Sequence, residues 1–477
     1  MPPRHLLIST TYLLLTSLLF DIAASEIETV PVRTPLSAAA GPDAYLDRDY
    51  NTVVLPWNLK TTVEAYRQHG QRDPAWNDTA ETFLTAWAHL FTGLEIEQDK
   101  GALLVLAEQL GEVDCRDPMV SYCRGKTYAW FDEHRKQSKD CFRQAYRAFK
   151  KSDHPAARKA WATYRILEQD FNKKGHRTGK KQRGLAEEYA AFFATSIAQQ
   201  EYQGIERLMV EHVTSNSAGC VHERQLVYDA IAEAVEPHRD SWYGATILGW
   251  AEMGRAWGAR GTGWASTVTE EGWRGFADHM GKAAALLGRA YEQAPEHPIA
   301  ATLMITVALS HQSRLSNRQW FDRAVAAQFD YRDAYDRLRW SLAPRWGGSA
   351  HQLVSFAKAC IATDRFDTFV PTTLLDVLHD IHKEAKKLER PAIASAIFDN
   401  DQAWQLSADL LDRLSADPER EALWFRSYKA ALAARFGKQD LARELVAEIG
   451  EDIYTRPFTT YDIDLDALQV TATADGF

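Results

Sequence analysis

Residues 283–295 read AAALLGRAYEQAP, and this stretch decides the fold. Ala283, Leu287 and Ala290 recur at spacings of four and three residues, which places them on one face of a helix. Small alanines on that face let a neighbouring helix approach closely, and the leucine fills the groove between the two. Pro295 then ends the helix, because proline cannot continue its hydrogen bonding. The stretch therefore predicts the second helix of an antiparallel pair.

A similar pattern recurs with a period of 34 residues. Arg289-Ala290 and Arg323-Ala324 are 34 residues apart, and Phe321 stands in the second copy as the large residue before the alanine. This period, with its order of alanine, large residue, alanine and proline, resembles the tetratricopeptide repeat. The resemblance implies an α-α superhelix, a solenoid of antiparallel helix pairs whose concave face binds a partner.

The rest of the chain is also predicted to be helical. From Ala75 to Gly450, segments of about 12–20 residues carry apolar side chains at i, i+3, i+4 and i+7, and no long β-type alternation interrupts them. The fold class is therefore all-α. The expected divisions are a signal peptide at 1–25, a flexible or irregular segment at 26–74, a first helical array at 75–172, a basic loop at 173–184, a second array with the repeats at 185–455 and an irregular tail at 456–477.

The first 25 residues predict export. Arg4 and His5 precede an apolar run from Leu6 to Phe20, and Ala23-Ala24-Ser25 suits a cleavage site. Cleavage after Ser25 would release a periplasmic or extracellular protein, and an uncleaved membrane anchor is the alternative. No later segment reaches about 18 consecutive apolar residues, so no membrane span is expected after the signal peptide.

The charge balance argues against a nucleic-acid partner. The 65 acidic residues outnumber the 55 basic ones, which gives a formal net charge of −10 over 477 residues. Proteins built for broad contact with phosphate backbones carry the opposite excess.

Three strings carry a more particular resemblance: WGARGTGWASTVTEEGW at 257–273, AATLMITVAL at 300–309 and PRWGGS at 344–349. Their order and spacing are similar to those of an exported bacterial family of tetratricopeptide-like proteins known only as a domain of unknown function. The similarity covers roughly residues 115–360. It implies the architecture and no particular chemistry.

The string at 257–273 is the first candidate binding site. The span from Gly249 to Pro295 is about 22 residues longer than the repeat requires, and the excess predicts an insertion between two helices. This insertion contains Arg260, Trp264 and Trp273 among several glycines. Such a loop either binds a ligand or partner, or is sealed onto the helices by its tryptophans.

The second candidate, PRWGGS, contains Arg345 and Trp346. Pro344 ends one helix and Ser349 suits the N-cap of the next, so a helix connection alone accounts for most of the string. A binding surface shared with 257–273 is the alternative.

No motif indicates a metal, a cofactor or a nucleophile. His379 and His382 lack a third ligand nearby in the sequence, and Ala467 stands where a calcium loop beginning at Asp462 requires glycine. The five cysteines are too few for a disulfide scaffold; we interpret them as buried apolar residues, with a Cys123–Cys141 bridge as the alternative.

Two functions remain. The first is an exported helical-repeat scaffold, without catalytic activity, that binds a protein or peptide. The second is a secreted all-α enzyme acting on polysaccharide, because sugar rings stack on tryptophan and two carboxylates in a cleft hydrolyse glycosides. The acids nearest the tryptophan cluster are Glu252, Glu270, Glu271 and Asp278, and none lies in a recognisable catalytic pattern.

Overall fold

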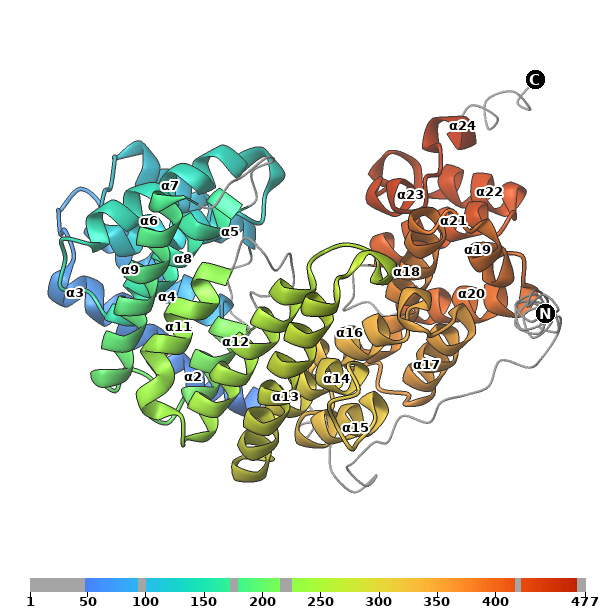
Figure 1. The fold of residues 1–477 in the computed structure, drawn as a ribbon. Coiled ribbons are helices and arrows are strands. Elements are labelled where there is room, and N and C mark those ends of the chain that lie inside the picture. The colour runs from blue at the N-terminus through green and yellow to red at the C-terminus, as the bar shows by residue number, and fades with distance from the viewer. Residues whose placement is uncertain (1–47, 93–99, 172–178, 215–224, 417–421, 470–477) are drawn as a thin grey trace, which may run out of the picture. The chain divides into compact units, whose positions relative to one another are not determined.

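The computed structural model describes residues 48–92, 100–171, 179–214, 225–416 and 422–469 (Figure 1). These residues form helices joined by turns and contain no strand, so the predicted all-α class is confirmed for this part of the chain. They separate into two compact units, 48–338 and 339–469. The predicted signal peptide lies outside the described residues.

The helices of the first unit pack mainly against their neighbours in the chain. Each helix from α4 to α8 contacts the next one along the chain, α9 contacts α11, and each helix from α11 to α14 contacts the next one. The elements are α2 (Arg48–Leu59), η2 (Lys60–Glu64), α3 (Ala65–His69), α4 (Asn77–Leu90), α5 (Lys100–Glu112), α6 (Pro118–Tyr128), η3 (Asp132–His134), α7 (Arg135–Phe149), α8 (Ala156–Phe171), α9 (Lys180–Ala198), α10 (Glu206–Thr214), α11 (Gln225–Val235), η5 (Glu236–His238), α12 (Trp242–Arg260), η6 (Ala265–Thr267), α13 (Glu270–Gln293), α14 (Pro298–Leu309), α15 (Asn317–Ala327) and the start of α16 (Arg332–Ser341).

The second unit contains a smaller apolar core toward its C-terminal end and a larger one. Leu378, Ile381, Ile397 and Leu411 are fully buried in the larger core, and they come from three different helices. The elements are η7 (Pro344–Trp346), α17 (Ala350–Ala362), η8 (Val370–Thr372), α18 (Thr373–Lys387), α19 (Pro391–Phe398), α20 (Asp401–Ser415), α21 (Ala422–Arg435), α22 (Gln439–Ile449), η9 (Gly450–Asp452), α23 (Arg456–Thr460) and α24 (Leu465–Gln469).

The close approach predicted between helix pairs is found between α12 and α13. Ala283, Leu287 and Ala290 are all buried on α13. A Cβ atom at Gly249 of α12 would lie 2.6 Å from Cγ of Leu287, so only glycine fits there. The two helices therefore pack backbone against side chain at this point.

The N-terminal segment is less irregular than its sequence predicts. Residues 26–74 were expected to be irregular, yet 48–69 form a continuous helical run. Val54, Trp57 and Tyr66 are buried along it. Pro56 lies within α2, and η2 is a π-helix with one wider turn, so neither matches the regular spacing by which an α-helix is recognised. Tertiary packing stabilises the run.

Three other predicted divisions also differ. The basic loop expected at 173–184 ends earlier, because α9 begins at Lys180 with Gly179 as its N-cap, and 172–178 lie outside the described residues. The boundary between the two units lies between residues 338 and 339 of the chain and not at this loop. The helices on either side of the loop, α8 and α9, pack together in one unit. The described part of the tail expected to be irregular, 456–469, contains α23 and α24, and Phe458, Tyr461 and Leu468 anchor it in apolar cores.

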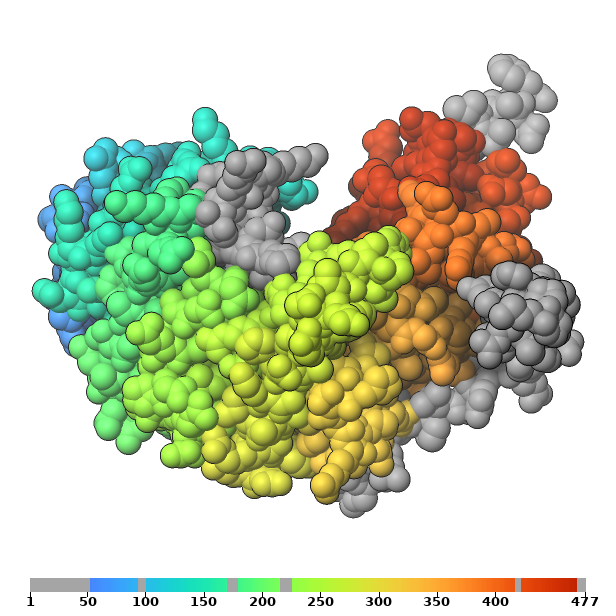
Figure 2. Space-filling model, in the orientation of Figure 1, coloured from blue at the N-terminus to red at the C-terminus, as the bar shows by residue number. Residues whose placement is uncertain are grey.

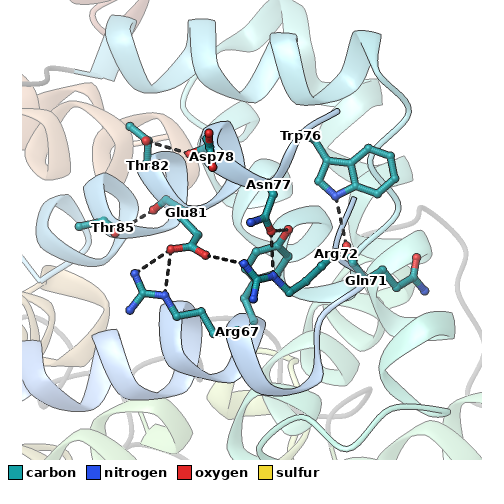
Figure 3. Close-up of polar contacts among 10 residues, drawn as sticks. Arg67, Gln71, Arg72, Trp76, Asn77, Asp78, Glu81, Thr82 and Thr85 are labelled. Carbon is teal, nitrogen blue, oxygen red and sulfur yellow. Dashed lines mark hydrogen bonds and ion pairs between the residues drawn. The ribbon is translucent and has the colours of Figure 1, made fainter. Parts of the chain in front are cut away.

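The corner between α3 and α4 is held by a compact polar network (Figure 3). The carboxylate of Glu81 lies between two guanidinium groups, 2.7 Å from Nη2 of Arg67 and 3.3 Å from Nη2 of Arg72. The Trp76 indole donates to the carbonyl oxygen of Gln71 at 3.1 Å. The network fixes the end of α3.

Two further predictions concern the membrane and the cysteines. Among the described helices, none combines the length and the apolar character that crossing a bilayer requires. Cys115, Cys123, Cys141 and Cys360 are buried free thiols, as the interpretation of them as small apolar residues predicts. Cys220 lies outside the described residues.

Candidate functional site

Both ends of the predicted insertion at 257–273 belong to helices. α12 continues to Arg260 and α13 begins at Glu270, so the connection is only 261–269. Gly261, with φ of 76°, ends α12, and the hydroxyl of Thr269 caps α13 by accepting from the Gly272 amide at 3.1 Å. The additional residues therefore lengthen both helices of one hairpin instead of forming a long loop.

The tip of this hairpin carries the three residues predicted as a candidate site. The Arg260 guanidinium lies 5.6 Å from the ring centre of Trp257 and 5.2 Å from that of Trp273. It also donates to the carbonyl oxygens of Gly261 at 3.2 Å and Gly263 at 3.1 Å. Burial by these neighbours lowers the pKa of Arg260. The arginine therefore orders the tip, which we define as residues 257–273.

Two tryptophan side chains at the tip face solvent. Trp264 is 55% exposed and Trp273 is 39% exposed, and the space-filling view shows this yellow-green part of the chain at the surface (Figure 2). Trp250, seven residues before Trp257, is instead buried against Tyr228, with ring centres 4.6 Å apart. Since α12 ends before Trp264, that residue does not continue the helical face of Trp250 and Trp257. The exposed indole of Trp264 does not seal the tip onto its neighbours.

The second candidate, Arg345 and Trp346, lies in the other unit and makes internal contacts. Arg345 Nη2 is 3.3 Å from Oε2 of Glu384, a carboxylate whose side chain is 4% exposed. The ring of Trp346 lies 4.8 Å from that of Trp340. Ser349 caps α17, accepting from the Gln352 amide at 3.2 Å. These contacts favour the helix-connection interpretation of PRWGGS.

Two of the acids considered for glycoside hydrolysis pair with basic side chains. Glu252 lies 2.6 Å from both Nη1 of Arg255 and Nδ1 of His279. Burial alone would raise the pKa of Glu252, but the hydrogen bonds with His279 and Arg255 outweigh burial and lower it. Glu271 pairs with Arg274 at 3.3 Å, and both side chains are exposed. A glycosidase acid needs a raised pKa, so Glu252 does not suit that role.

His382 of α18 is paired with a neighbouring carboxylate. His382 Nε2 lies 2.9 Å from Oδ2 of Asp462, which pairs with Lys386 as well. Within the described part of the chain, no group of three His, Cys, Asp or Glu residues is arranged to hold a metal ion.

Two hollows that no sequence motif indicated lie beside α3 in the first unit. A cavity of about 470 Å³ is walled by η2, α3, the turn before α8 and the end of α9. A more open hollow of about 1150 Å³ adjoins it and shares Gln68, His69 and Asp153 with it. Most of one wall comes from the segment predicted to be irregular, which is why sequence reasoning missed it. The signal that could have found it is the apolar stretch that ends in Trp57, which follows Val53, Val54 and Leu55.

The comparisons with known proteins leave the family open. No protein-family model matches the sequence, and no curated protein matches it.

Proposed function

We propose that this protein is an exported, tetratricopeptide-like α-solenoid scaffold without catalytic activity, which binds another protein or peptide through the tip of the α12–α13 hairpin. Export to the periplasm or the extracellular space is the part of the proposal that rests on residues 1–25 alone.

The pairing of helices in the first unit supports the tetratricopeptide-like arrangement. Ala290 of α13 and Ala324 of α15 are both buried, as expected for equivalent positions 34 residues apart. Gly249 and Leu287 meet where the first and second helices of a repeat touch. Packing between chain neighbours is the contact pattern of a stacked array.

The exposure of Trp264 and Trp273 around Arg260 is the observation that carries the binding role. Trp130 is the other tryptophan exposed to a comparable degree in the described residues, at 37%. Trp and Arg dominate the energetics of protein interfaces, because each contributes a large contact area and a polar handle. A helical hairpin that brings two indoles and one guanidinium together at its end suits insertion into a groove on a partner.

Capture from an envelope extract, followed by a binding measurement with the purified partner, tests the proposal. The Arg260→Ala/Trp264→Ala variant should lose partner binding by at least about thirtyfold, the effect of removing one interface hot spot of about 2 kcal/mol. Its helicity and unfolding midpoint should stay close to those of the wild type, because Trp264 is mostly exposed and the contacts of Arg260 described above stay within the tip.

Trp130→Ala is the matched control, since it truncates a surface tryptophan away from the tip. It should bind the partner like the wild type. Unchanged binding by the tip variant would overturn the proposal. A stability loss of about 3–5 kcal/mol in the tip variant would instead identify the tip as a structural element.

A further inference from the structure

The cavity beside α3 has features of a built binding site, independent of the hairpin tip. Its walls come from three stretches of the first unit: η2 and α3, the turn at 153–156 before α8, and residues 192–201 at the end of α9. At about 470 Å³ it is within the size range of small-molecule sites. The corner network of Figure 3 holds the α3 wall, because Arg67 and Arg72 clamp Glu81 of α4.

One wall of the cavity is a π-helix. The Ala65 amide donates to the carbonyl oxygen of Lys60, five residues earlier, which defines η2. Lys60, Thr61 and Glu64 of this turn line the cavity. π-Helical turns are rare and occur frequently at functional sites, because the wider turn redirects side chains.

A buried arginine holds the π-helix from behind. Arg158 Nη2 donates to Oδ1 of Asn58 at 2.6 Å and to the hydroxyl of Thr61 at 2.7 Å. Its guanidinium lies 4.4 Å from the ring centre of Trp57 and 4.8 Å from that of Trp161. Each of these contact partners is uncharged, although burying a cation without a counter-ion is costly. The two hydrogen bonds and the two ring contacts of Arg158 hold the wall in place.

His154 gives the cavity an unsatisfied polar group. The side chain is only 3% exposed, it lines the cavity, and neither ring nitrogen has a hydrogen-bond partner. It lies between the rings of Phe149, 5.3 Å away, and His69, 6.0 Å away. A buried polar group without a partner destabilises the fold, and a hydrogen bond from a ligand in the cavity would remove that cost.

Charges of both signs surround the cavity. Lys60 and Lys159 contribute cations, and Glu64 and Asp153 contribute carboxylates. Within the described part of the chain, no ion pair and no side-chain hydrogen bond involves the ammonium group of Lys60 or the carboxylates of Glu64 and Asp153. Glu201 also lines the cavity, but its carboxylate already accepts from the amides of Ala156 at 2.9 Å and Ala157 at 2.7 Å.

We propose that this cavity binds a small zwitterion of the amino-acid or dipeptide class, with its ammonium group paired to Glu64 and Asp153, its carboxylate paired to Lys60 and Lys159, and a hydrogen bond to His154. A neutral imidazole suits this ligand because it can donate to a carboxylate or accept from an ammonium group without repelling either.

Other small ligands fit the walls less well. A sugar ring needs a bare aromatic face, but Trp57 has Tyr202 stacked on it at 5.4 Å and Arg158 over it. Phe192 has the ammonium group of Lys159 5.8 Å from its ring centre. An inorganic anion would meet the carboxylates of Glu64 and Asp153.

Isothermal titration of the purified chain at neutral pH with alanyl-alanine tests the proposal. N-acetyl-alanyl-alanine and alanyl-alanine amide each lack one of the two charges and should bind at least about tenfold more weakly. Maltose and inorganic phosphate represent a neutral and an anionic ligand and should not bind at about 10 mM. Equal or tighter binding of maltose or phosphate, or no binding of alanyl-alanine at that concentration, would overturn the proposal.

Three variants locate the site. Glu64→Gln, Lys60→Met and His154→Phe should each weaken alanyl-alanine binding by about fivefold or more, the effect of one lost charge-assisted contact of about 1 kcal/mol. Glu187→Gln and Lys139→Met, exposed positions outside the cavity, are the matched controls and should bind like the wild type. Binding that survives all three cavity variants would place the ligand elsewhere and refute the assignment.

The experiments distinguish a failure of the hairpin proposal from a failure of the cavity proposal. The Arg260→Ala/Trp264→Ala variant should bind alanyl-alanine normally, because its substitutions are not in the cavity walls.

Discussion

His154 shows how one side chain can couple stability to pH. Burial lowers its pKa from 6.5 to about 4, and the charges of His69 and Lys159 act in the same direction while Asp153 opposes them. Between these two pH values the unfolded chain binds a proton at this residue and the folded chain does not. The folded state therefore loses stability as the pH falls through this range.

We predict that this residue alone costs the fold about 3 kcal/mol by pH 4, relative to pH 7. Urea unfolding of the wild type and of His154→Phe at both pH values measures it. The variant should lose less stability on acidification than the wild type by that difference. Equal losses in the two proteins would show that His154 is not held neutral.

Trp250 and Trp264 have the same side chain in opposite environments. Trp250 is buried against Tyr228, whereas Trp264 is 55% exposed. We predict that Trp250→Ala lowers the free energy of unfolding by about 3–5 kcal/mol, because it leaves a cavity. Trp264→Ala should change it by no more than about 0.5 kcal/mol. Chemical denaturation of both variants gives the comparison, and similar losses would contradict the placement of Trp264 at the surface.

At the scale of the helices, Gly249 and Gly288 allow the effect of close packing to be compared with the effect of helix propensity. Gly249 of α12 faces Leu287 with no room for a Cβ atom, whereas nothing lies within 4 Å of a Cβ built on Gly288 of α13. We predict that Gly288→Ala stabilises the protein by about 0.5–1 kcal/mol, because alanine favours the helix. Gly249→Ala should destabilise it by about 1–3 kcal/mol through overpacking.

Thermal unfolding followed by far-ultraviolet circular dichroism checks this pair of variants. Stabilisation by both substitutions would mean that α12 and α13 are further apart than described, and the helix-pair assignment would fail with it.

The helices that could be predicted from the sequence are those with regular spacing and good capping residues. Ala283, Leu287 and Ala290 determine α13 because their side chains share one face, and Pro295 marks its end. The run 48–69 could not be predicted in this way, since Pro56 and the π-turn break the spacing and distant partners stabilise it.

Of the two candidate sites, the hairpin tip could be predicted from the sequence and the cavity could not. Arg260, Trp264 and Trp273 attract notice because their composition is unusual, and the structure brings them together at one tip. The cavity residues have ordinary composition and come from segments about 50 to 100 residues apart in the chain, so only the folded structure brings Lys60, His154 and Glu201 together.

For the whole molecule, the proposed signal peptide at 1–25 leads to a prediction about the N-terminus of the exported chain. We predict that the chain recovered from an exporting host begins at Glu26, because the small residues before it suit a signal peptidase. Mass spectrometry of the intact protein measures this directly. A mass that retains residues 1–25, in a membrane fraction, would favour the uncleaved anchor.

The long-range contacts of α2 have a consequence for the order of events during synthesis. Most helices pack on chain neighbours and can form as soon as they are made. The indole of Trp57, however, donates to the carbonyl oxygen of Glu201, 144 residues later. Closing so long a loop carries an entropic cost that local pairs do not bear. The first helical run can pack against α4 as soon as that helix is made, but the hydrogen bond from Trp57 to Glu201 forms only after 144 more residues have been synthesised. During that interval the indole of Trp57 is open to chaperones, proteases and other nascent chains.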